Sequence, residues 1–269
     1  MSAFHQGTFG IEKIDSTTLK PTLKSVNGKK YEGQKMLKTE EEIEDALYNL
    51  VNKFEDLGCS HVESSFIAVV HIDGNAMGKK VNDFYKSVDN KAKWSKFKDK
   101  LNDFSKSIDK DFKDAYKEMV QTVQEALEAG TLESLELKDN NFPVRRIITA
   151  GDDICFVTDG RIGIECAVTF IEKLTKKKNK CIKGNNAEYA ACAGVAIVHQ
   201  KYPFYQAYDL AEKLCSNAKK FGAALGSEND TDASYNGANV SSIDWHIEYG
   251  EIKDTLKEIR NQYITADGN

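Results

Sequence analysis

From residue 66 onward, short apolar runs alternate along the chain with longer segments in which apolar residues recur every three or four positions. The apolar runs occupy residues 66–72, 144–149, 154–158 and 189–199. They are rich in Val, Ile and Ala, and because β-branched residues fit a covered, pleated surface, the runs predict buried strands. The periodic segments predict amphipathic helices at residues 97–130, 162–178 and 204–221.

The predicted order from residue 66 is strand, helix, strand, strand, helix, strand, helix. This order is that of a split βαβ unit, so the sequence predicts an α+β, ferredoxin-like (βαββαβ) fold with additional helices. A stretch rich in Gly, Asn, Asp and Ser, residues 222–240, predicts a loop. A late strand at 243–249 and a terminal helix at 251–262 are expected after it.

The N-terminal part has a weaker pattern. Residues 1–38 show little periodicity, and we interpret them as an irregular arm or edge strands. Thr39 and Glu42 match a capping box at the start of a helix that would end at Gly58. We therefore expect two parts: residues 1–62, an arm and helix that pack on the main domain, and residues 63–269, the main domain itself.

Composition narrows the class of protein. The chain has 269 residues, of which 41% are hydrophobic, and its net charge of −5 argues against direct, sequence-independent nucleic-acid binding. It contains neither a run of about 20 apolar residues nor a signal-peptide pattern. Its six cysteines include no CxxC pair, so we expect them to pack as small hydrophobic residues in a cytoplasmic protein.

Carboxylates follow two of the predicted strands. Asp73 ends the first strand, and Asp152 and Asp153 lie in an Ala-Gly-Asp-Asp turn between two others. Adjacent carboxylates repel each other, and a cation between the turn and Asp73 would remove that repulsion. Mg²⁺ prefers oxygen ligands and leaves several positions for water and phosphate. The pattern therefore predicts a metal site formed by Asp73, Asp152 and Asp153, and phosphoryl or nucleotidyl transfer as its chemistry.

A short glycine-containing loop follows Asp73. It comprises Gly74, Asn75, Ala76, Met77 and Gly78. Its glycines allow a tight turn with backbone amides available to anionic oxygens, so the loop is a candidate phosphate-binding element. The GxxxxGK[ST] pattern of a Walker loop is absent from the sequence.

Three motifs together resemble a known family. They are HIDGNAMGKK, AGDD, and AGVAIVHQKYPFYQAYDLAEKLCSNAKKFG, within residues 64–250. The chain resembles the second palm domain of the large polymerase–cyclase subunit of type III CRISPR effectors, which makes cyclic oligoadenylates from ATP. It is more distantly similar to the GGDEF diguanylate cyclases.

The resemblance assigns roles to individual residues. It implies that Asp73 is the first metal aspartate and that Asp152 and Asp153, after Gly151, are the paired acids of a GGDD-like hairpin. It also implies that Lys219 contacts triphosphate. Two positions differ from the family pattern. Ala150 replaces the first glycine, which a hairpin tolerates if the φ angle there is negative, and Asn75 stands where relatives often carry a second acid.

The resemblance implies a stand-alone palm enzyme that uses Mg²⁺ or Mn²⁺. It would join or cyclise nucleoside triphosphates, with ATP favoured, into a cyclic nucleotide signal for antiviral defence. Because related enzymes pair two palms, we expect a homodimer of C2 symmetry whose clefts, marked by Asp73 and Gly151, face each other. Otherwise, the N-terminal 60 residues would fold over the cleft and supply the second nucleotide site.

Two other functions are compatible with the sequence. One is a palm that binds a nucleotide or a partner protein without turnover, which Asn75 favours and the three intact carboxylates disfavour. The other, more remote, is a ring-opening GTP hydrolase on the same fold.

Overall fold

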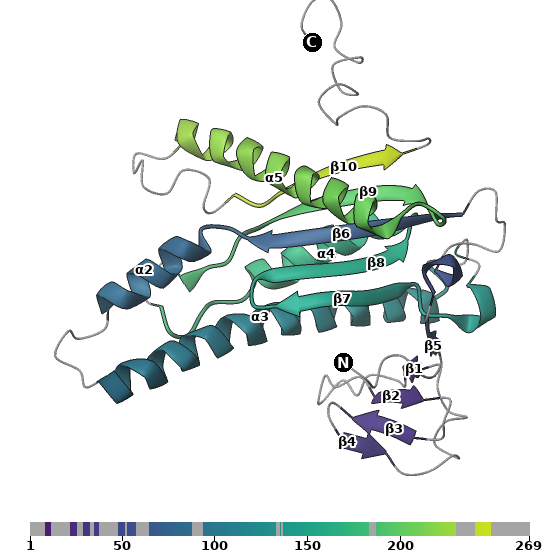
Figure 1. Cartoon of the computed structure of the whole chain (residues 1–269), viewed down its shortest axis with the longest axis horizontal. Coiled ribbons are helices and arrows are strands. Elements are labelled where there is room, and N and C mark those ends of the chain that lie inside the picture. Colours follow the sequence, from purple (N-terminus) through teal and green to yellow (C-terminus); the bar gives the residue numbers. More distant parts are fainter. Residues whose placement is uncertain are drawn as a thin grey trace, which may run out of the picture.

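A five-stranded mixed sheet forms the centre of the protein, with strand order β10-β9-β6-β8-β7 (Figure 1). The computed structural model describes residues 48–51, 53–57, 65–87, 94–132, 135, 137–182, 187–229 and 240–248, and four short strands between residues 9 and 37. The strands of the central sheet are β6 (Phe66–Gly74), β7 (Val144–Ala150), β8 (Asp153–Asp159), β9 (Ala191–His199) and β10 (Ser242–Glu248). The described helices are α2 (Met77–Ser87), α3 (Trp94–Glu128), α4 (Gly163–Thr175) and α5 (Phe204–Asn229), with 3₁₀ turns η2 (Phe54–Asp56) and η4 (Lys138–Asn140).

Strand β6 lies in the middle of this sheet and is antiparallel to both of its neighbours, β8 and β9. Strand β10 instead runs parallel to β9, which requires a crossover connection, and α5 lies within it. The predicted ferredoxin-like α+β fold with additional helices is confirmed.

The two faces of the sheet bury alternate residues of each strand. Ile67 and Val69 of β6 pack in the cluster beneath α5, on what we call the α5 face. Ala68, Val70 and Ile72 pack on the opposite face, in the larger cluster that contains buried residues of α3 and α4. This double coverage explains why the sequence of the inner strands is nearly all apolar.

Helix α5 packs so close to β9 that a side chain at residue 194 would not fit between them. A Cβ atom on Gly194 would lie 1.9 Å from the carbonyl oxygen of Ala211 and 2.4 Å from the backbone nitrogen of Cys215. Both contacts are with backbone atoms, which cannot move aside by changing rotamer. The absence of a side chain at residue 194 therefore sets the height of α5 above the sheet.

Four predicted strands, three predicted helices and the late strand are all present, with shifted ends. The loop predicted at 222–240 is wrong for its first part, because α5 continues to Asn229. Gly222 is buried there, and a Cβ atom on it would lie 3.1 Å from Ser242 Oγ, so this glycine serves close packing on β10 rather than helix termination. The terminal helix expected at 251–262 lies outside the described residues.

The prediction of a helix between Thr39 and Gly58 is wrong for the residues of this range that the structure describes. Residues Tyr48–Leu50 form strand β5, and η2 follows. The carbonyls of Asn49 and Val51 accept hydrogen bonds from the Phe142 amide and the Arg145 guanidinium, which holds this segment extended. Residues 39–47 and the expected domain boundary at residue 62 lie outside the described residues.

Described residues between 48 and 57 nevertheless pack on the central sheet. Val51 and Leu57 are buried on the α5 face, and the Phe54 ring stacks on Phe204 with centroids 4.9 Å apart. A second sheet, of order β4-β3-β2-β1-β5, contains β1 (Phe9–Ile11), β2 (Thr22–Ser25), β3 (Lys29–Glu32) and β4 (Lys35–Leu37). The sequence predicted an irregular arm or edge strands for residues 1–38, and the strands described there belong to this separate sheet.

The described cysteines behave as small hydrophobic residues. Cys155, Cys166, Cys192 and Cys215 are buried. Burial raises the pKa of the Cys155, Cys166 and Cys215 thiols to about 12, so these thiols stay protonated at neutral pH. Within the part of the chain that the structure describes, no helix has the length and apolar character needed to cross a membrane.

Candidate functional site

The sheet register brings two of the predicted carboxylates together. Asp73, next to last in β6, lies directly opposite Asp153, the first residue of β8. Residues opposite each other in an antiparallel pair project to the same face, with Cβ atoms about 4.5–5.5 Å apart. Asp73 forms an ion pair with Lys219 of α5, so this face is the α5 face.

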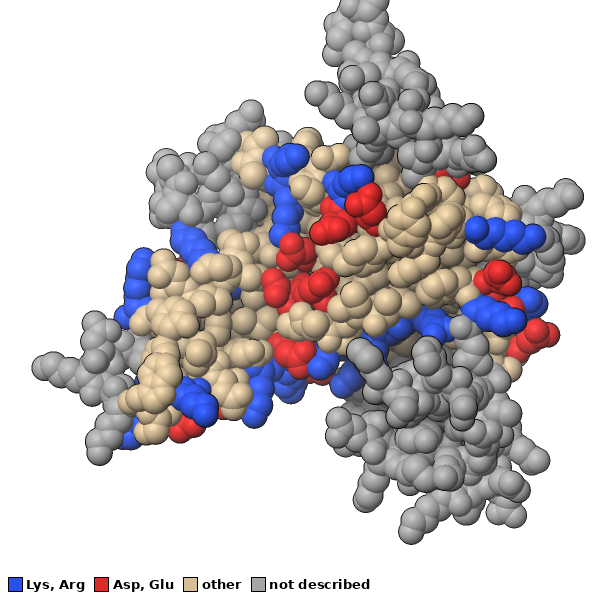
Figure 2. Space-filling model, viewed as in Figure 1, with Lys and Arg blue, Asp and Glu red and all other residues tan. Residues whose placement is uncertain are grey.

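Asp152, in the turn between β7 and β8, is close to the same place. A Cβ atom on Gly74 would lie 3.0 Å from the Cβ of Asp152, so the turn rests on the end of β6. Burial raises the pKa of Asp152, and the negative charges of Asp73 and Asp153 raise it further. Figure 2 shows acidic side chains gathered in the middle of the face it presents, beside basic side chains. The three carboxylates therefore form one cluster.

The hairpin that carries Asp152 and Asp153 has a two-residue turn. Ala150 pairs with Asp153, and Gly151 has a φ angle of 67°. Positive φ at the first turn residue alone is the pattern of a type II′ turn, which favours glycine there. Ala150 is not among the residues with positive φ, so the condition for tolerating alanine in place of the first GGDD glycine is met.

Residues 74–78 form a strand–turn–helix connection rather than an open loop. Gly74 ends β6, and Met77 begins α2, a helix that was not predicted from the sequence. Ala76 has a φ angle of 53°, a strained conformation for alanine. The first amides of a helix have no acceptor within the helix, so those of Met77 and Gly78 can bind anionic oxygens near Asp73.

Asn75 has a structural role in this connection. Its side-chain Nδ2 donates a hydrogen bond to the Val240 carbonyl at 2.7 Å, and its backbone amide donates to the Ala190 carbonyl at 2.8 Å. The residue is buried, with 6% of its surface exposed. An aspartate here would direct a carboxylate oxygen at a carbonyl oxygen. The family difference at residue 75 therefore fits the local structure, which uses an amide donor.

Lys219 lies within reach of the whole carboxylate cluster. Its ammonium group contacts Asp73, and its charge opposes the pKa increase of Asp152. The side chains of Lys219 and Asp73 are each 37% exposed, so solvent and ligands can reach the pair. A cation is thus already present at this group of carboxylates, in the form of a lysine side chain.

The donor set fits a hard divalent cation. Asp153 Oδ1 is buried and has no hydrogen-bond partner among the described residues, so no protein donor saturates this carboxylate oxygen. As the side chains stand, no three His, Cys, Asp or Glu side chains of the described residues are arranged to hold a metal. Mg²⁺ needs only one or two protein carboxylates, however, and Lys219 occupies the position next to Asp73.

Two further residues, Asp109 and His71, lie near the site. The Gly151 amide donates to Asp109 Oδ1 of α3 at 3.4 Å, a contact between residues 42 positions apart that no local pattern reveals. His71 Nδ1 lies 3.7 Å from Asp153 Oδ1 on the same face. His71 is buried and its ring meets Tyr208 edge-on, as in a core histidine.

We expect that replacing Asp152 by asparagine raises the melting temperature at neutral pH. The raised pKa means that the folded protein binds this proton more strongly than the unfolded chain, so the ionised carboxylate destabilises the fold. Each kcal/mol corresponds to about 2–4 °C in a domain of this size. The gain should disappear as the pH falls through the raised pKa and below about 4, where both states are protonated. Thermal unfolding across this pH range measures it, and a difference independent of pH would contradict the interpretation.

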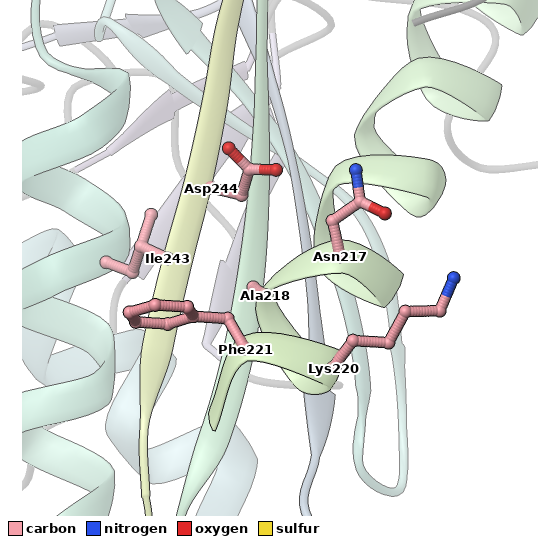
Figure 3. A pocket seen from close by; sticks show the side chains of 6 residues that line it. All are labelled: Asn217, Ala218, Lys220, Phe221, Ile243 and Asp244. Carbon is pink, nitrogen blue, oxygen red and sulfur yellow. The ribbon is translucent and has the colours of Figure 1, made fainter. Parts of the chain in front are cut away.

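A surface pocket of about 340 Å³ lies on another side of α5. Figure 3 shows its described lining residues, which come from α5 and β10: Asn217, Ala218, Lys220, Phe221, Ile243 and Asp244. It contains none of the predicted site residues. The candidate site is thus the carboxylate cluster at the strand ends and not this pocket.

Comparison with known proteins identifies one family. Residues 66–224, more than half of the chain, match the family described as Cas10/Cmr2, second palm domain. No curated protein sequence matches the chain. Similar solved structures include a Csm1-Csm4 cassette in complex with cA4, 15% identical with a TM-score of 0.42, covering 66% of this chain and 22% of that one. Another is the cassette in complex with AMPPNP, 16% identical with a TM-score of 0.41, covering 68% of this chain and 24% of that one.

Proposed function

Because this chain belongs to the Cas10/Cmr2 second palm domain family, we propose that it is a Mg²⁺-dependent nucleotidyltransferase. It joins or cyclises nucleoside triphosphates, with ATP favoured, into a nucleotide signal for antiviral defence. The observation that carries the proposal is the pairing of Asp73 with Asp153 at the strand ends, with Asp152 beside them. Such a group of partly exposed acids at the strand ends has little structural use and suits a cation and a triphosphate.

The residues of the site have three separate roles: metal binding, triphosphate binding and positioning of the acids. Asp73, Asp152 and Asp153 would hold Mg²⁺ or Mn²⁺, which neutralises phosphate charge and makes a ribose hydroxyl more acidic. The first amides of α2, at Met77 and Gly78, and the Lys219 ammonium bind triphosphate oxygens. The Gly151 turn fixes the two hairpin acids relative to β6. Together these groups orient a donor nucleotide for attack by an acceptor hydroxyl, which removes an entropic barrier.

Incubation of the pure protein with each nucleoside triphosphate and Mg²⁺ or Mn²⁺, followed by mass spectrometry of the products, tests the function. We expect pyrophosphate and a linked or cyclic nucleotide, formed fastest from ATP. Nucleotide binding without product would identify a non-catalytic palm. A ring-opened product from GTP would identify the hydrolase instead.

We also propose that the active form is a C2 homodimer. The described part of the chain contains one cluster of three carboxylates, and joining two nucleotides needs a donor and an acceptor held in line. Two copies with facing clefts would each contribute one nucleotide.

Dilution of the enzyme provides the test of the dimer. We expect specific activity to fall as the protein is diluted towards nanomolar concentration, in parallel with a change from dimer to monomer mass in light scattering. Constant specific activity from a monomer would contradict the dimer. That result would point to the N-terminal 60 residues as the source of the second nucleotide site.

A further inference from the structure

The ion pair between Lys219 and Asp73 joins two groups that the proposed function needs separately. The Asp73 carboxylate is one of the proposed cation ligands, and the Lys219 ammonium is the proposed triphosphate ligand. In the structure the two side chains bind each other. Neither can take up its proposed ligand fully while that contact persists.

We propose that Lys219 is a built-in counter-cation that blocks the metal site until a triphosphate draws it away from Asp73. This inference rests on the proposed function, because it takes the assignment of the three carboxylates to a cation from it. Lys219 is thereby a positioning residue for metal entry as well as a ligand of the nucleotide. Metal and triphosphate then bind cooperatively, each aiding the other by the same factor.

The charges of the site supply the reason for such an arrangement. Burial raises the pKa of Asp152 most, and the charges of Asp73 and Asp153 raise it further, so the three carboxylates repel one another when all are ionised. A lysine ammonium offsets this repulsion in the absence of metal. When the lysine leaves, the cluster requires another cation, and a divalent ion is the stronger partner for several carboxylates.

When Lys219 moves away from Asp73, the packing of α5 allows its side chain to move but holds the helix in place. Gly194 holds the α5 backbone against β9, and Ser242 Oγ donates a hydrogen bond to the Ala218 carbonyl at 2.7 Å. The helix turn that carries Lys219 is therefore fixed on two sides. The lysine stem is flexible, and the start of α2 is connected to Asp73 through only Gly74, Asn75 and Ala76. A triphosphate at the first amides of α2 thus lies near the lysine.

The first test measures Mn²⁺ binding without nucleotide, by electron paramagnetic resonance or calorimetry. Lys219→Met removes the competing ammonium but keeps the length of the stem, so we expect Mn²⁺ to bind about fivefold tighter or more. Lys213→Met is the matched control, because Lys213 lies on the same helix and pairs with Asp209 instead. Its Mn²⁺ affinity should equal that of the wild type. Unchanged or weaker Mn²⁺ binding by Lys219→Met would overturn the proposal.

The second test measures ATP binding in EDTA, where metal plays no part. Asp73→Asn frees Lys219 and removes one negative charge, whereas Asp153→Asn removes one negative charge and leaves the ion pair in place. We expect Asp73→Asn to bind ATP about fivefold tighter than Asp153→Asn does. Equal affinities would show that only net charge matters and would overturn the proposal.

These outcomes are distinguishable from failure of the proposed function. If no triphosphate is converted to product but Lys219→Met still binds Mn²⁺ more tightly, the counter-cation role stands and the catalytic assignment fails. If product is formed but both binding tests show no difference, the catalytic assignment stands and the counter-cation role fails.

Discussion

Replacing Asp152 and Asp153 together by alanine is expected to reduce product formation at least about a thousandfold, which corresponds to roughly 4 kcal/mol of transition-state stabilisation. The change removes two of the three acids of the carboxylate cluster, and Asp73 would remain there with Lys219 as its partner. A single carboxylate neutralised by a lysine retains little attraction for a divalent ion. The measurement is the initial rate of pyrophosphate release at saturating ATP and Mg²⁺.

The same variant should keep its fold, because loss of like-charge repulsion costs the metal-free protein little. Its melting temperature is therefore expected to equal or exceed that of the wild type. Asp209→Ala is a suitable control, since Asp209 is an exposed acid of α5 that pairs with Lys213 away from the cluster. Activity retained in the double variant would place the chemistry elsewhere in the molecule.

Replacing Gly194 by alanine is expected to cost about 3 kcal/mol or more in the free energy of unfolding. The added methyl group would overlap the carbonyl of Ala211 and the amide of Cys215, so α5 must move away from β9. Lys219 would move with the helix, and activity should fall more than the folded fraction does. Urea unfolding followed by circular dichroism measures the first effect, and activity per folded molecule measures the second.

Gly78→Ala provides the contrast for the stability measurement. A Cβ atom at Gly78 meets nothing within 4 Å, and the residue lies in α2, where alanine is favoured over glycine by about 0.5–1 kcal/mol. This variant should therefore be as stable as the wild type or slightly more stable. If both glycine variants lost stability equally, the close approach of α5 to β9 would not be the cause of the loss at Gly194.

Most of the central domain could be predicted from the sequence because its strands are covered on both sides. Runs such as 66–72 and 189–199 are apolar at nearly every position, and only buried strands of this length explain them. Helix α2 was missed although Met77, Val81 and Phe84 recur at helical spacing, because its first residues were assigned to the glycine-containing loop. The segment 48–57 was assigned wrongly because Val51, Phe54 and Leu57 have helix-like spacing, while contacts with Phe142 and Arg145, distant in sequence, determine its conformation.

The carboxylates of the site were visible in the sequence because each follows a recognisable strand. Their arrangement was not, since it depends on the register that sets Asp73 opposite Asp153 and on the resting of the Gly151 turn against Gly74. The ion pair of Lys219 with Asp73 spans 146 positions and has no local signal. Sequence motifs thus identify the residues of the site, while strand pairing and contacts between residues distant in sequence determine how these residues interact.

The central place of β6 has a consequence for the order of folding during synthesis. This strand pairs on one side with β8 and on the other with β9, about 125 residues further along the chain. Such distant pairing is slow to form, and on the ribosome it cannot begin before the later strand has emerged. The nascent chain can therefore pair β6 with the β7–β8 hairpin early, and this pairing brings Asp73 close to Asp153. It acquires Lys219, the only counter-charge we identify for Asp73 among the described residues, after β9 and most of α5 have been made. Until α5 has been made, the carboxylates of the cluster can be neutralised only by ions from solution. The divalent-cation concentration of the cell can therefore influence how efficiently this protein folds.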